Sequence, residues 1–413
     1  MREFYMDTVT QQARLNGKPY FLRGSNVTLL RFFEDDACGS LPWNSVWVRN
    51  LHKGFKNFHW NSLRYCIGFP PEEWYDIADE EGILIQDEFP IWYGGKTWST
   101  WPKELKSEEL VKQYTEWMRA HWNHPCVVIW DASNETFNKT DELANAVRQV
   151  RGLDLSNRPW DNGYSPLREA GDVYEAHPYH FQDPLFKLKD IARESKRPQG
   201  NEHPNDGSHA VIINEYGWLW LNRDGSPTTL TRELYKNLLG AGATAAQRRR
   251  LYAQYLAAET EFWRCHRTVA GVLHFTALGY SRNSGQTSDH FVKVTTLQYE
   301  PEFLKYVPDA FSPIGLMLDE WGEALAAGQS HLFPVIAIND LEKDWRGEVE
   351  LRVLKEGNVV SKNSERILIP AYGTTRLGIS CALPKTKAIY TVEAVLKMAN
   401  GREVKSIREL PVE

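Results

Sequence analysis

The sequence predicts an α/β protein, namely a (β/α)8 barrel (TIM barrel) followed by a small immunoglobulin-like β-sandwich. Three observations predict this fold class. Short apolar runs of the buried-strand type recur up to residue 275, at intervals that suit one strand plus one helix. Amphipathic helical patterns lie between these runs. Past residue 306 the pattern changes to alternating apolar and polar residues separated by turn signals.

Eight apolar runs are the candidate barrel strands. They are 20–23, 62–65, 83–86, 127–130, 159–162, 173–177, 211–214 and 271–275. Eight such strands in a row, with no other sheet to join, fit a closed parallel barrel. The helical patterns cover 43–56, 71–81, 103–122, 140–153, 184–194 and 245–266. Gly82 follows the second of these helices, where a left-handed residue commonly ends a helix before the next strand.

The C-terminal part reads as a separate all-β region. After a short helical stretch, its candidate strands are 335–338, 348–354, 365–369, 374–379 and 390–396. Alternation with period two indicates strands that are buried on one face only, as in a sandwich of two sheets. We therefore expect a barrel domain over 1–310, with a short N-terminal lead-in, and a sandwich over 311–413.

Composition narrows the classes of function. A chain of 413 residues with 42% hydrophobic content can bury a large core, and its net charge of −6 provides no basic stripe for nucleic acid. We expect no membrane partner either. The 16 Trp, 18 Tyr and 17 Phe suit a core and also sugar binding. The five cysteines are odd in number and widely spaced, which predicts free, mostly buried thiols.

Two glutamates stand where a barrel carries its chemistry. In a TIM barrel the reacting groups follow the carboxyl ends of the strands. The fourth strand is followed by Asn134 and Glu135, and the seventh by Asn214 and Glu215. Hydrolysis of a glycosidic bond needs one carboxylic acid to protonate the leaving oxygen and one carboxylate to attack the sugar or to activate water. The pair Glu135 and Glu215 meets that need.

Several motifs resemble glycoside hydrolase family 2 over roughly residues 3 to 340. Its first signature is similar to 61–64, Phe69-Pro70, 74–76 and 79–85, and its acid/base signature is similar to 122–130 closing with Asn134-Glu135. The run 15–19, followed by 22–26, resembles the family's entry into the barrel. The resemblance implies an exo-acting, retaining β-glycosidase that works by double displacement through a covalent glycosyl-enzyme.

The resemblance also implies residue roles. Glu135 is the expected acid/base and Glu215 the expected nucleophile, while Asn134 is expected to hydrogen-bond the sugar 2-hydroxyl. Arg64 is expected either to keep Glu215 ionised or to form a salt bridge that holds the barrel together. Tyr179 is expected to hydrogen-bond Glu215 or the sugar, and His177 to line the pocket.

Softer candidates come from other strand ends and from the residues after Glu215. For these side chains, sugar contact competes with a structural role. They are Asp87, Asn162, Trp218 and His274.

The chain also departs from the family pattern. The stretch 66–70 lacks a His that commonly contacts sugar, Asp131 replaces a small residue, and the Asn-x-Lys pair of glucuronidases is missing. We expect an oligosaccharide, polysaccharide or glycoside substrate, with β-galactosidase-like specificity ahead of β-mannosidase or β-glucuronidase.

Alternatives to this enzyme come from different classes of protein. A metal-dependent barrel hydrolase would need clustered ligands after the first strand, where the chain has 23–26 (Arg-Gly-Ser-Asn), so we expect neither metal nor cofactor. Family members normally carry two β-domains before the barrel. Either the sequence is a fragment or those domains are absent, and this keeps open a catalytically weak or inactive carbohydrate-binding barrel. The polar first ten residues predict no signal peptide, and the sequence assigns neither compartment nor oligomeric state.

Overall fold

A computed structural model describes residues 2–35, 38–93, 101–136, 141–165, 169–198 and 207–413. The chain divides into two compact units, and each is described by itself. The first contains Met1–His180, Arg197–Leu230 and Thr268–Tyr299, and the second contains Phe181–Lys196, Thr231–Arg267 and Glu300–Glu413. The domain boundary expected between residues 310 and 311 stays a prediction.

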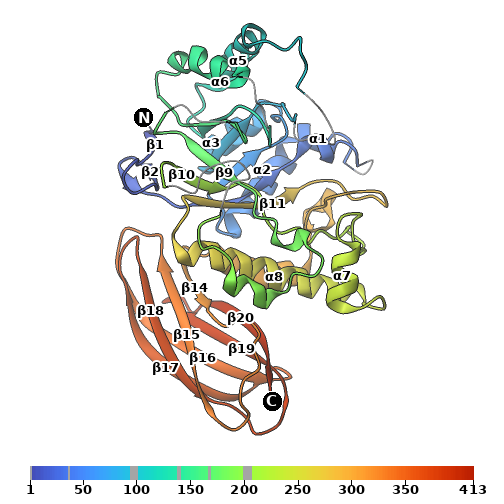
Figure 1. Cartoon of the computed structure of the whole chain (residues 1–413), viewed down its shortest axis with the longest axis vertical. Coiled ribbons are helices and arrows are strands. Elements are labelled where there is room, and N and C mark those ends of the chain that lie inside the picture. The colour runs from blue at the N-terminus through green and yellow to red at the C-terminus, as the bar shows by residue number, and fades with distance from the viewer. Residues whose placement is uncertain (1, 36–37, 94–100, 137–140, 166–168, 199–206) are drawn as a thin grey trace. The chain divides into compact units, whose positions relative to one another are not determined.

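The first unit holds a near-closed barrel of eight parallel strands (Figure 1). The sheet order is β8-β7-β6-β5-β4-β11-β10-β9, and β8 and β9 at its two ends lie in contact. All eight predicted strands are confirmed. They are β4 (Leu22–Val27), β5 (Ser62–Tyr65), β6 (Leu84–Glu88), β7 (Val127–Asp131), β8 (Trp160–Asp161), β9 (Val173–Ala176), β10 (Ala210–Ile213) and β11 (Gly271–Leu278).

The barrel interior is apolar toward the amino ends of its strands. Leu22, Leu84 and Ile212 belong to one buried cluster there. A small antiparallel sheet adds Phe4 and Ala13 to the same cluster. This sheet consists of β1 (Phe4–Met6), β2 (Ala13–Leu15) and β3 (Lys18–Pro19). The polar side chains of the candidate site lie at the opposite end, after the carboxyl ends of the strands.

Helices of the first unit connect these strands. They are α1 (Leu29–Phe32), α2 (Ser45–Asn57), α3 (Glu73–Glu81), α5 (Ser107–His121) and α6 (Glu142–Val150). The side chain of Asn44 caps α2 by accepting a hydrogen bond from the Trp47 backbone N–H. Gly82 ends α3 with a φ of 70°, which confirms the predicted left-handed cap. The shorter elements are η1 (Leu41–Trp43), η2 (Arg151–Leu153), β12 (Phe291–Lys293), η5 (Val294–Thr296) and β13 (Gln298–Tyr299).

The longest helix of the second unit follows the sequence pattern. The long helix α8 (Ala245–His266) is confirmed to the residue, and a capping box between Thr244 and Gln247 starts it. The helix expected over 184–194 is wrong, since only the 3-10 helix η4 (Leu188–Arg193) forms. There the Asp190 side chain accepts a hydrogen bond from the Lys187 N–H, so the helical turns begin only after Lys187. The structure adds α7 (Arg232–Leu239), and α9 (Pro301–Ala310) overlaps the short helical stretch expected before the C-terminal strands.

The second unit ends in two antiparallel sheets with one shared core. Phe333, Leu351 and Val392, from strands of both sheets, are fully buried in that core. The five predicted strands are confirmed, and the structure adds β14 and β20. One sheet is β14 (Ile314–Leu318), β15 (Ser330–Asn339) and β18 (Thr374–Ala382), and the other is β17 (Asn358–Ile369), β16 (Trp345–Lys355), β19 (Ala388–Lys397) and β20 (Glu403–Val412).

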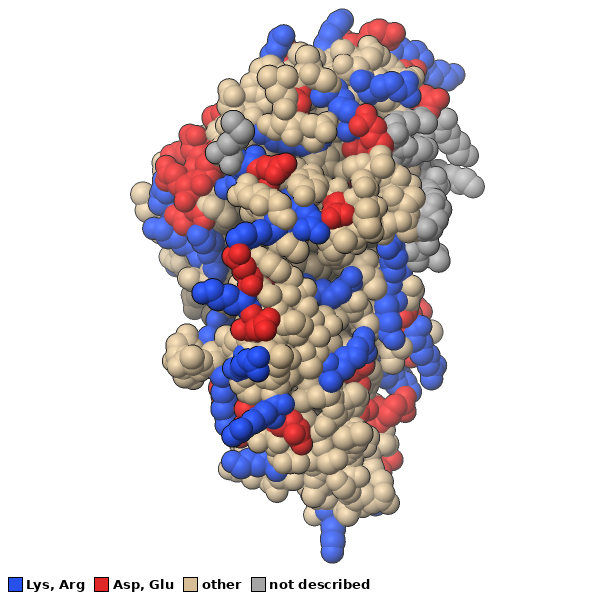
Figure 2. All heavy atoms as spheres, turned by 90° about the vertical axis from the view of Figure 1, so that its left-hand side faces the viewer, with Lys and Arg blue, Asp and Glu red and all other residues tan. Residues whose placement is uncertain are grey.

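The five thiols match what the composition predicts. On the face shown in Figure 2, basic side chains are interspersed with acidic ones. All five cysteines are free and buried, as expected. Among the helices of the described residues, none combines the length and the apolar character needed to cross a bilayer.

Candidate active site

Glu135 and Glu215 meet at the carboxyl ends of the barrel strands. Glu135 follows β7 and Glu215 follows β10. Three atoms lie within 4.8 Å of one another: one carboxylate oxygen of Glu135, one of Glu215, and a ring nitrogen of His177. Carboxyl groups of retaining glycosidases lie about 5–5.5 Å apart, and those of inverting enzymes about 6.5–9.5 Å. The close approach of this pair suits direct attack on the sugar rather than attack by an interposed water.

Arg64, fully buried on β5, organises the Glu215 side of the site. Its Nη1 donates to Glu215 Oε1 at 2.8 Å, and its Nη2 donates to Asn134 Oδ1 at 2.8 Å. The same guanidinium also pairs with Glu88 and, at 3.1 Å, with Asp131. Arg64 therefore makes both kinds of contact that the sequence left open: it pairs with Glu215, and it forms salt bridges within the barrel. Its fixed, multidentate contacts hold the Glu215 carboxylate in one orientation.

His177 lies between three carboxylates. Its Nδ1 is 2.8 Å from Glu135 Oε1 and 3.8 Å from Glu215 Oε2, and its Nε2 is 3.1 Å from Glu175 Oε2. Burial lowers the pKa of His177, but the charges of Glu215 and Glu175 outweigh burial and hold it well above the ordinary value. Burial raises the pKa of Glu135, yet its hydrogen bond with His177 brings the net pKa below the ordinary range. The resting pair is thus an imidazolium and a carboxylate.

The backbone of Glu135 is held in an uncommon conformation. Its φ is 42°, in the left-handed region that non-glycine residues seldom adopt. The Glu135 N–H donates to Glu175 Oε1 at 3.3 Å, and Tyr164 Oη donates to Glu135 Oε1 at 3.1 Å. These contacts fix both the main chain and the side chain of Glu135.

An aromatic wall stands beside Glu215. Tyr179 Oη donates a short hydrogen bond to Glu215 Oε2. The Tyr179 ring lies 5.0 Å from the Trp218 ring and 5.6 Å from the Trp220 ring. These three residues pack in one cluster with Cys66 and Phe275. Aromatic faces next to a carboxylate pair suit the apolar C–H face of a sugar ring.

Comparison with known families decides the affiliation of this site. The family model described as "Glycosyl hydrolases family 2, TIM barrel domain" matches residues 8–237. The chain belongs to glycoside hydrolase family 2. The match covers more than half of the chain and includes both Glu135 and Glu215. Retaining hydrolysis is the chemistry of this family.

Relatives in family 2 carry several substrate names. A putative beta-glucuronidase of Formosa agariphila is 31% identical over 147 residues, which cover 34% of this chain and 17% of that protein. The beta-mannosidase of Rattus norvegicus is 30% identical over 124 residues, covering 30% and 13%. The solved exo-chitosanase of Amycolatopsis orientalis has a TM-score of 0.71 at 16% identity, covering 99% of this chain and 51% of that one. The chain thus spans only part of the length of these proteins.

Other candidate residues lie inside the barrel wall. Asp87 is fully buried and accepts hydrogen bonds from Tyr75 Oη at 2.6 Å and Trp117 Nε1 at 2.8 Å. His274 is also fully buried, and burial lowers its pKa to about 3. Asn162 is 3% exposed just after β8. The sugar contacts expected of these residues stay predictions, and the contacts of Asp87 tie it to α3 and α5.

Further carboxylates complete the site; of these Glu175 was passed over in the sequence, while Asp131 was noted only as a departure from the family pattern. Glu175 bonds His177, the Glu135 N–H and, at 3.4 Å, Arg64. Burial raises the pKa of Asp131 to about 6 against the opposing charge of Arg64, and raises that of Glu88 well above its ordinary value. Acidic residues inside apolar strand runs were the signal available in the sequence. A carboxylate in a buried strand requires a partner inside the barrel.

Among the described residues, three groups of side chains are close enough to share a metal ion. Two of them belong to the carboxylate network above, and the third is Asp79 with His124 and Cys126. In this third group, Asp79 Oδ2 and Glu72 Oε1 already contact the two ring nitrogens of His124, at 2.8 and 2.9 Å. The expectation that the chain holds no metal stays a prediction.

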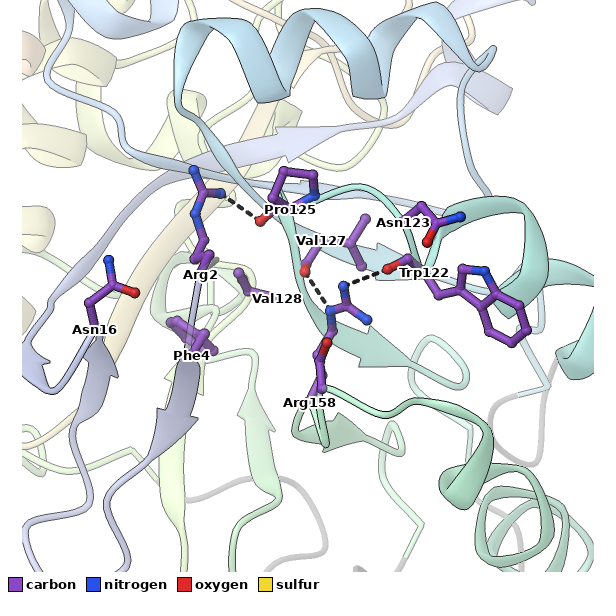
Figure 3. Close-up of a pocket in the computed structure, with 10 residues that line it drawn as sticks. Arg2, Phe4, Asn16, Trp122, Asn123, Pro125, Val127, Val128 and Arg158 are labelled. Atoms are coloured by element: carbon purple, nitrogen blue, oxygen red, sulfur yellow. Dashed lines mark hydrogen bonds between the residues drawn. The ribbon is translucent and has the colours of Figure 1, made fainter.

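Away from this site, a cavity of about 570 Å³ lies at the amino end of β7 (Figure 3). Its two arginines point at backbone carbonyls. Arg2 Nη1 donates to Pro125 O at 2.6 Å, and Arg158 Nε donates to Val127 O at 2.8 Å. Because amino ends of barrel strands serve stability rather than chemistry, we assign these arginines a structural role.

Proposed function

We propose that this chain carries the catalytic centre of a retaining, exo-acting β-glycoside hydrolase, with Glu215 as nucleophile and Glu135 as acid/base. One observation carries the proposal: the two carboxylates approach within 4.8 Å at the barrel mouth, and each has its own cationic partner. Arg64 holds Glu215, and His177 holds Glu135. The substrate is a β-linked terminal sugar of a glycoside, oligosaccharide or polysaccharide.

The first half of the reaction forms a glycosyl-enzyme. The leaving oxygen takes a proton from Glu135 while Glu215 Oε attacks the anomeric carbon, so the glycosidic bond breaks as an ester bond forms. Glu135 is a carboxylate at rest, but His177 Nδ1 holds a proton 2.8 Å from Glu135 Oε1. Transfer of that proton supplies the acid form of Glu135 without a proton from bulk water.

The second half releases the sugar. Glu135, again a carboxylate, removes a proton from water, and the resulting hydroxide oxygen attacks the anomeric carbon of the ester. The bond to Glu215 breaks, and Arg64 and Tyr179 stabilise the departing carboxylate through their hydrogen bonds. Asn134 is expected to bond the sugar 2-hydroxyl, since its side chain is oriented by Arg64.

The decisive experiment is a panel of aryl β-glycosides: galactoside, mannoside, glucoside and glucuronide. Wild type is assayed beside Glu135→Gln and Glu215→Gln, with Glu116→Gln as matched control because its side chain is 76% exposed on α5. We expect one sugar to be hydrolysed, with activity reduced by at least about 10³-fold in both site variants and unchanged in the control.

A second readout tests the nucleophile assignment. In Glu135→Ala, added azide fills the space of the lost carboxylate and attacks the glycosyl-enzyme, so it should restore turnover and yield a β-glycosyl azide. In Glu215→Ala, azide should yield the α-product. Sugar binding without turnover in the wild type would instead support the alternative of a carbohydrate-binding barrel.

A further inference from the structure

A pocket of about 330 Å³ opens beside the proposed catalytic centre. Its lining residues follow the carboxyl ends of β4, β5, β6 and β11, which is the end of the barrel that carries Glu135 and Glu215. Ile67, which lines this pocket, packs against the aromatic cluster that holds Tyr179. The pocket and the candidate nucleophile therefore share one wall.

The charge of this pocket comes from Arg31. Its guanidinium lies 5.6 Å from the centre of the Trp92 ring and 5.8 Å from that of Phe275. Its Nη1 donates to Thr287 Oγ1 at 2.8 Å. In the part of the chain that the structure describes, Arg31 forms no ion pair. Such a guanidinium, flanked by aromatic rings and using one donor on a hydroxyl, keeps the other donors of its planar fork for an anion.

The other charges of the pocket cancel. Arg282 Nη2 pairs with Glu34 Oε2 at 2.7 Å, and both side chains are about half exposed. Arg282 also lies over the Tyr280 ring, at 4.9 Å. The pocket is therefore left with the net positive charge of Arg31. Polar side chains of Ser284 and Gln286 add hydrogen-bonding groups to the lining.

The catalytic centre next to this pocket has the opposite character. Glu135, Glu215 and Glu175 are gathered there around Arg64 and His177, and both of these cations already contact carboxylates. Phe275 connects the two regions, since its ring centre lies 5.8 Å from the Arg31 guanidinium and it packs in the cluster that holds Cys66 and Tyr179. An anionic group on a bound sugar is repelled by the carboxylates and attracted toward Arg31.

We propose that this pocket is a subsite for an anionic substituent, a carboxylate or a sulfate, on the sugar substrate. The inference rests on the proposed glycosidase function and names the substrate class as an acidic glycoside. Trp92 and Tyr280 supply faces for the sugar ring, and Arg31 supplies the charge-assisted hydrogen bonds that select the anion. The glucuronidase Asn-x-Lys pair is missing from this sequence, and Arg31 takes over anion recognition at a different place.

The test compares matched acidic and neutral substrates. Nitrophenyl β-glucuronide is paired with β-glucoside, and nitrophenyl β-galactoside 6-sulfate with β-galactoside. Each is assayed with wild type, Arg31→Gln, Arg31→Lys and the control Arg119→Gln, whose side chain is 58% exposed on α5. We expect Arg31→Gln to lower kcat/KM for the acidic member of a pair by about 10- to 100-fold and for its neutral partner by less than about 3-fold.

The variants and the salt dependence add two independent readouts. Arg31→Lys keeps the charge but loses the planar fork, so it should recover only part of the preference for the acidic member. Added salt should weaken this preference in the wild type and leave the neutral substrates unaffected. The better acidic substrate identifies the source of the anion, a uronic acid or a sulfated sugar.

Failure of the inference and failure of the proposed function are distinguishable. Equal hydrolysis of both members of each pair, unchanged in Arg31→Gln, overturns the subsite and leaves the glycosidase intact. If wild type hydrolyses none of the four substrates, calorimetric titration with free glucuronate and galactose 6-sulfate decides. Binding that is lost in Arg31→Gln but kept in Arg119→Gln supports the subsite, and equal binding by all variants, or none, overturns it.

Discussion

Replacing Glu175 by Gln tests how the site holds the proton that Glu135 has to deliver. Glu175 is fully buried on β9 and accepts from His177, from the Glu135 N–H and, at 3.2 Å, from Asn214 Nδ2. Burial raises its pKa, but the charge of His177 dominates and holds that pKa at about 2. Glutamine keeps the shape of Glu175 and removes its charge.

The magnitude follows from the loss of that charge. A carboxylate 3.1 Å from the imidazole favours its protonated form, so Glu175→Gln should lower the pKa of His177. The proton shared by His177 and Glu135 is then lost at lower pH. We expect the basic limb of the kcat/KM profile to move down by about 1–2 units, and kcat/KM at neutral pH to fall by about 10- to 100-fold.

The assay is a pH profile of kcat/KM on the best aryl glycoside, with a urea unfolding curve for each variant. Glu88→Gln is the matched control, because Glu88 is equally buried and bonds Arg64, and within the described residues it makes no hydrogen bond or ion pair with His177. The control should leave the basic limb in place. A Glu175→Gln enzyme that is merely less stable, with its basic limb at the wild-type pH, would refute the coupling between Glu175 and His177.

Three further predictions concern the wall, the core and a helix end. Tyr179→Phe removes the hydroxyl that donates to Glu215 and should lower kcat about 10-fold with little change in KM, as steady-state kinetics would show; an unchanged kcat would count against its place in the mechanism. Leu351→Ala empties a fully buried site in the sandwich and should reduce the free energy of unfolding by about 2–5 kcal/mol, measured with urea. Gly82→Ala, at a φ of 70° with open space around the new Cβ, should cost about 1 kcal/mol from backbone strain alone, and a stabilising effect would contradict this reasoning.

The barrel was predictable because its signals are local. Each strand is a short apolar run followed by a turn residue, and a helix such as α8 carries its own capping box. Strand β20 was missed because its residues, such as Lys405 and Arg408, give a charged run, and Arg408 is buried only because it pairs with Glu261 at 2.8 Å. That contact joins parts of the chain far apart in sequence, and no local pattern records it.

The residues of the candidate site likewise fall into those with local sequence signals and those defined by contacts between distant parts of the chain. Positions after strand ends, together with family motifs, predicted Glu135, Glu215, Arg64, His177 and Tyr179 at the mouth of the barrel. Glu175 was missed because it sits inside a strand, and a single acidic residue in such a run gives no hint of its partner. What joins Glu175 to His177 and Arg64 is the closure of the barrel, which only the folded structure supplies.

The charge balance of the site favours a cationic transition state. Burial raises the pKa of Glu88 and Asp161 well above their ordinary values and so disfavours their charged forms. Arg64 and His177 then face the carboxylates of Glu135, Glu215, Glu175 and Asp131 with fewer positive than negative charges. Glycoside hydrolysis passes through an oxocarbenium-like, positively charged state. A site with this excess of negative charge therefore stabilises the transition state more than it stabilises the neutral substrate. A sugar-like amine that is protonated at neutral pH should therefore bind more tightly than its neutral lactam, and equal affinities would show that the excess charge does not reach the anomeric centre.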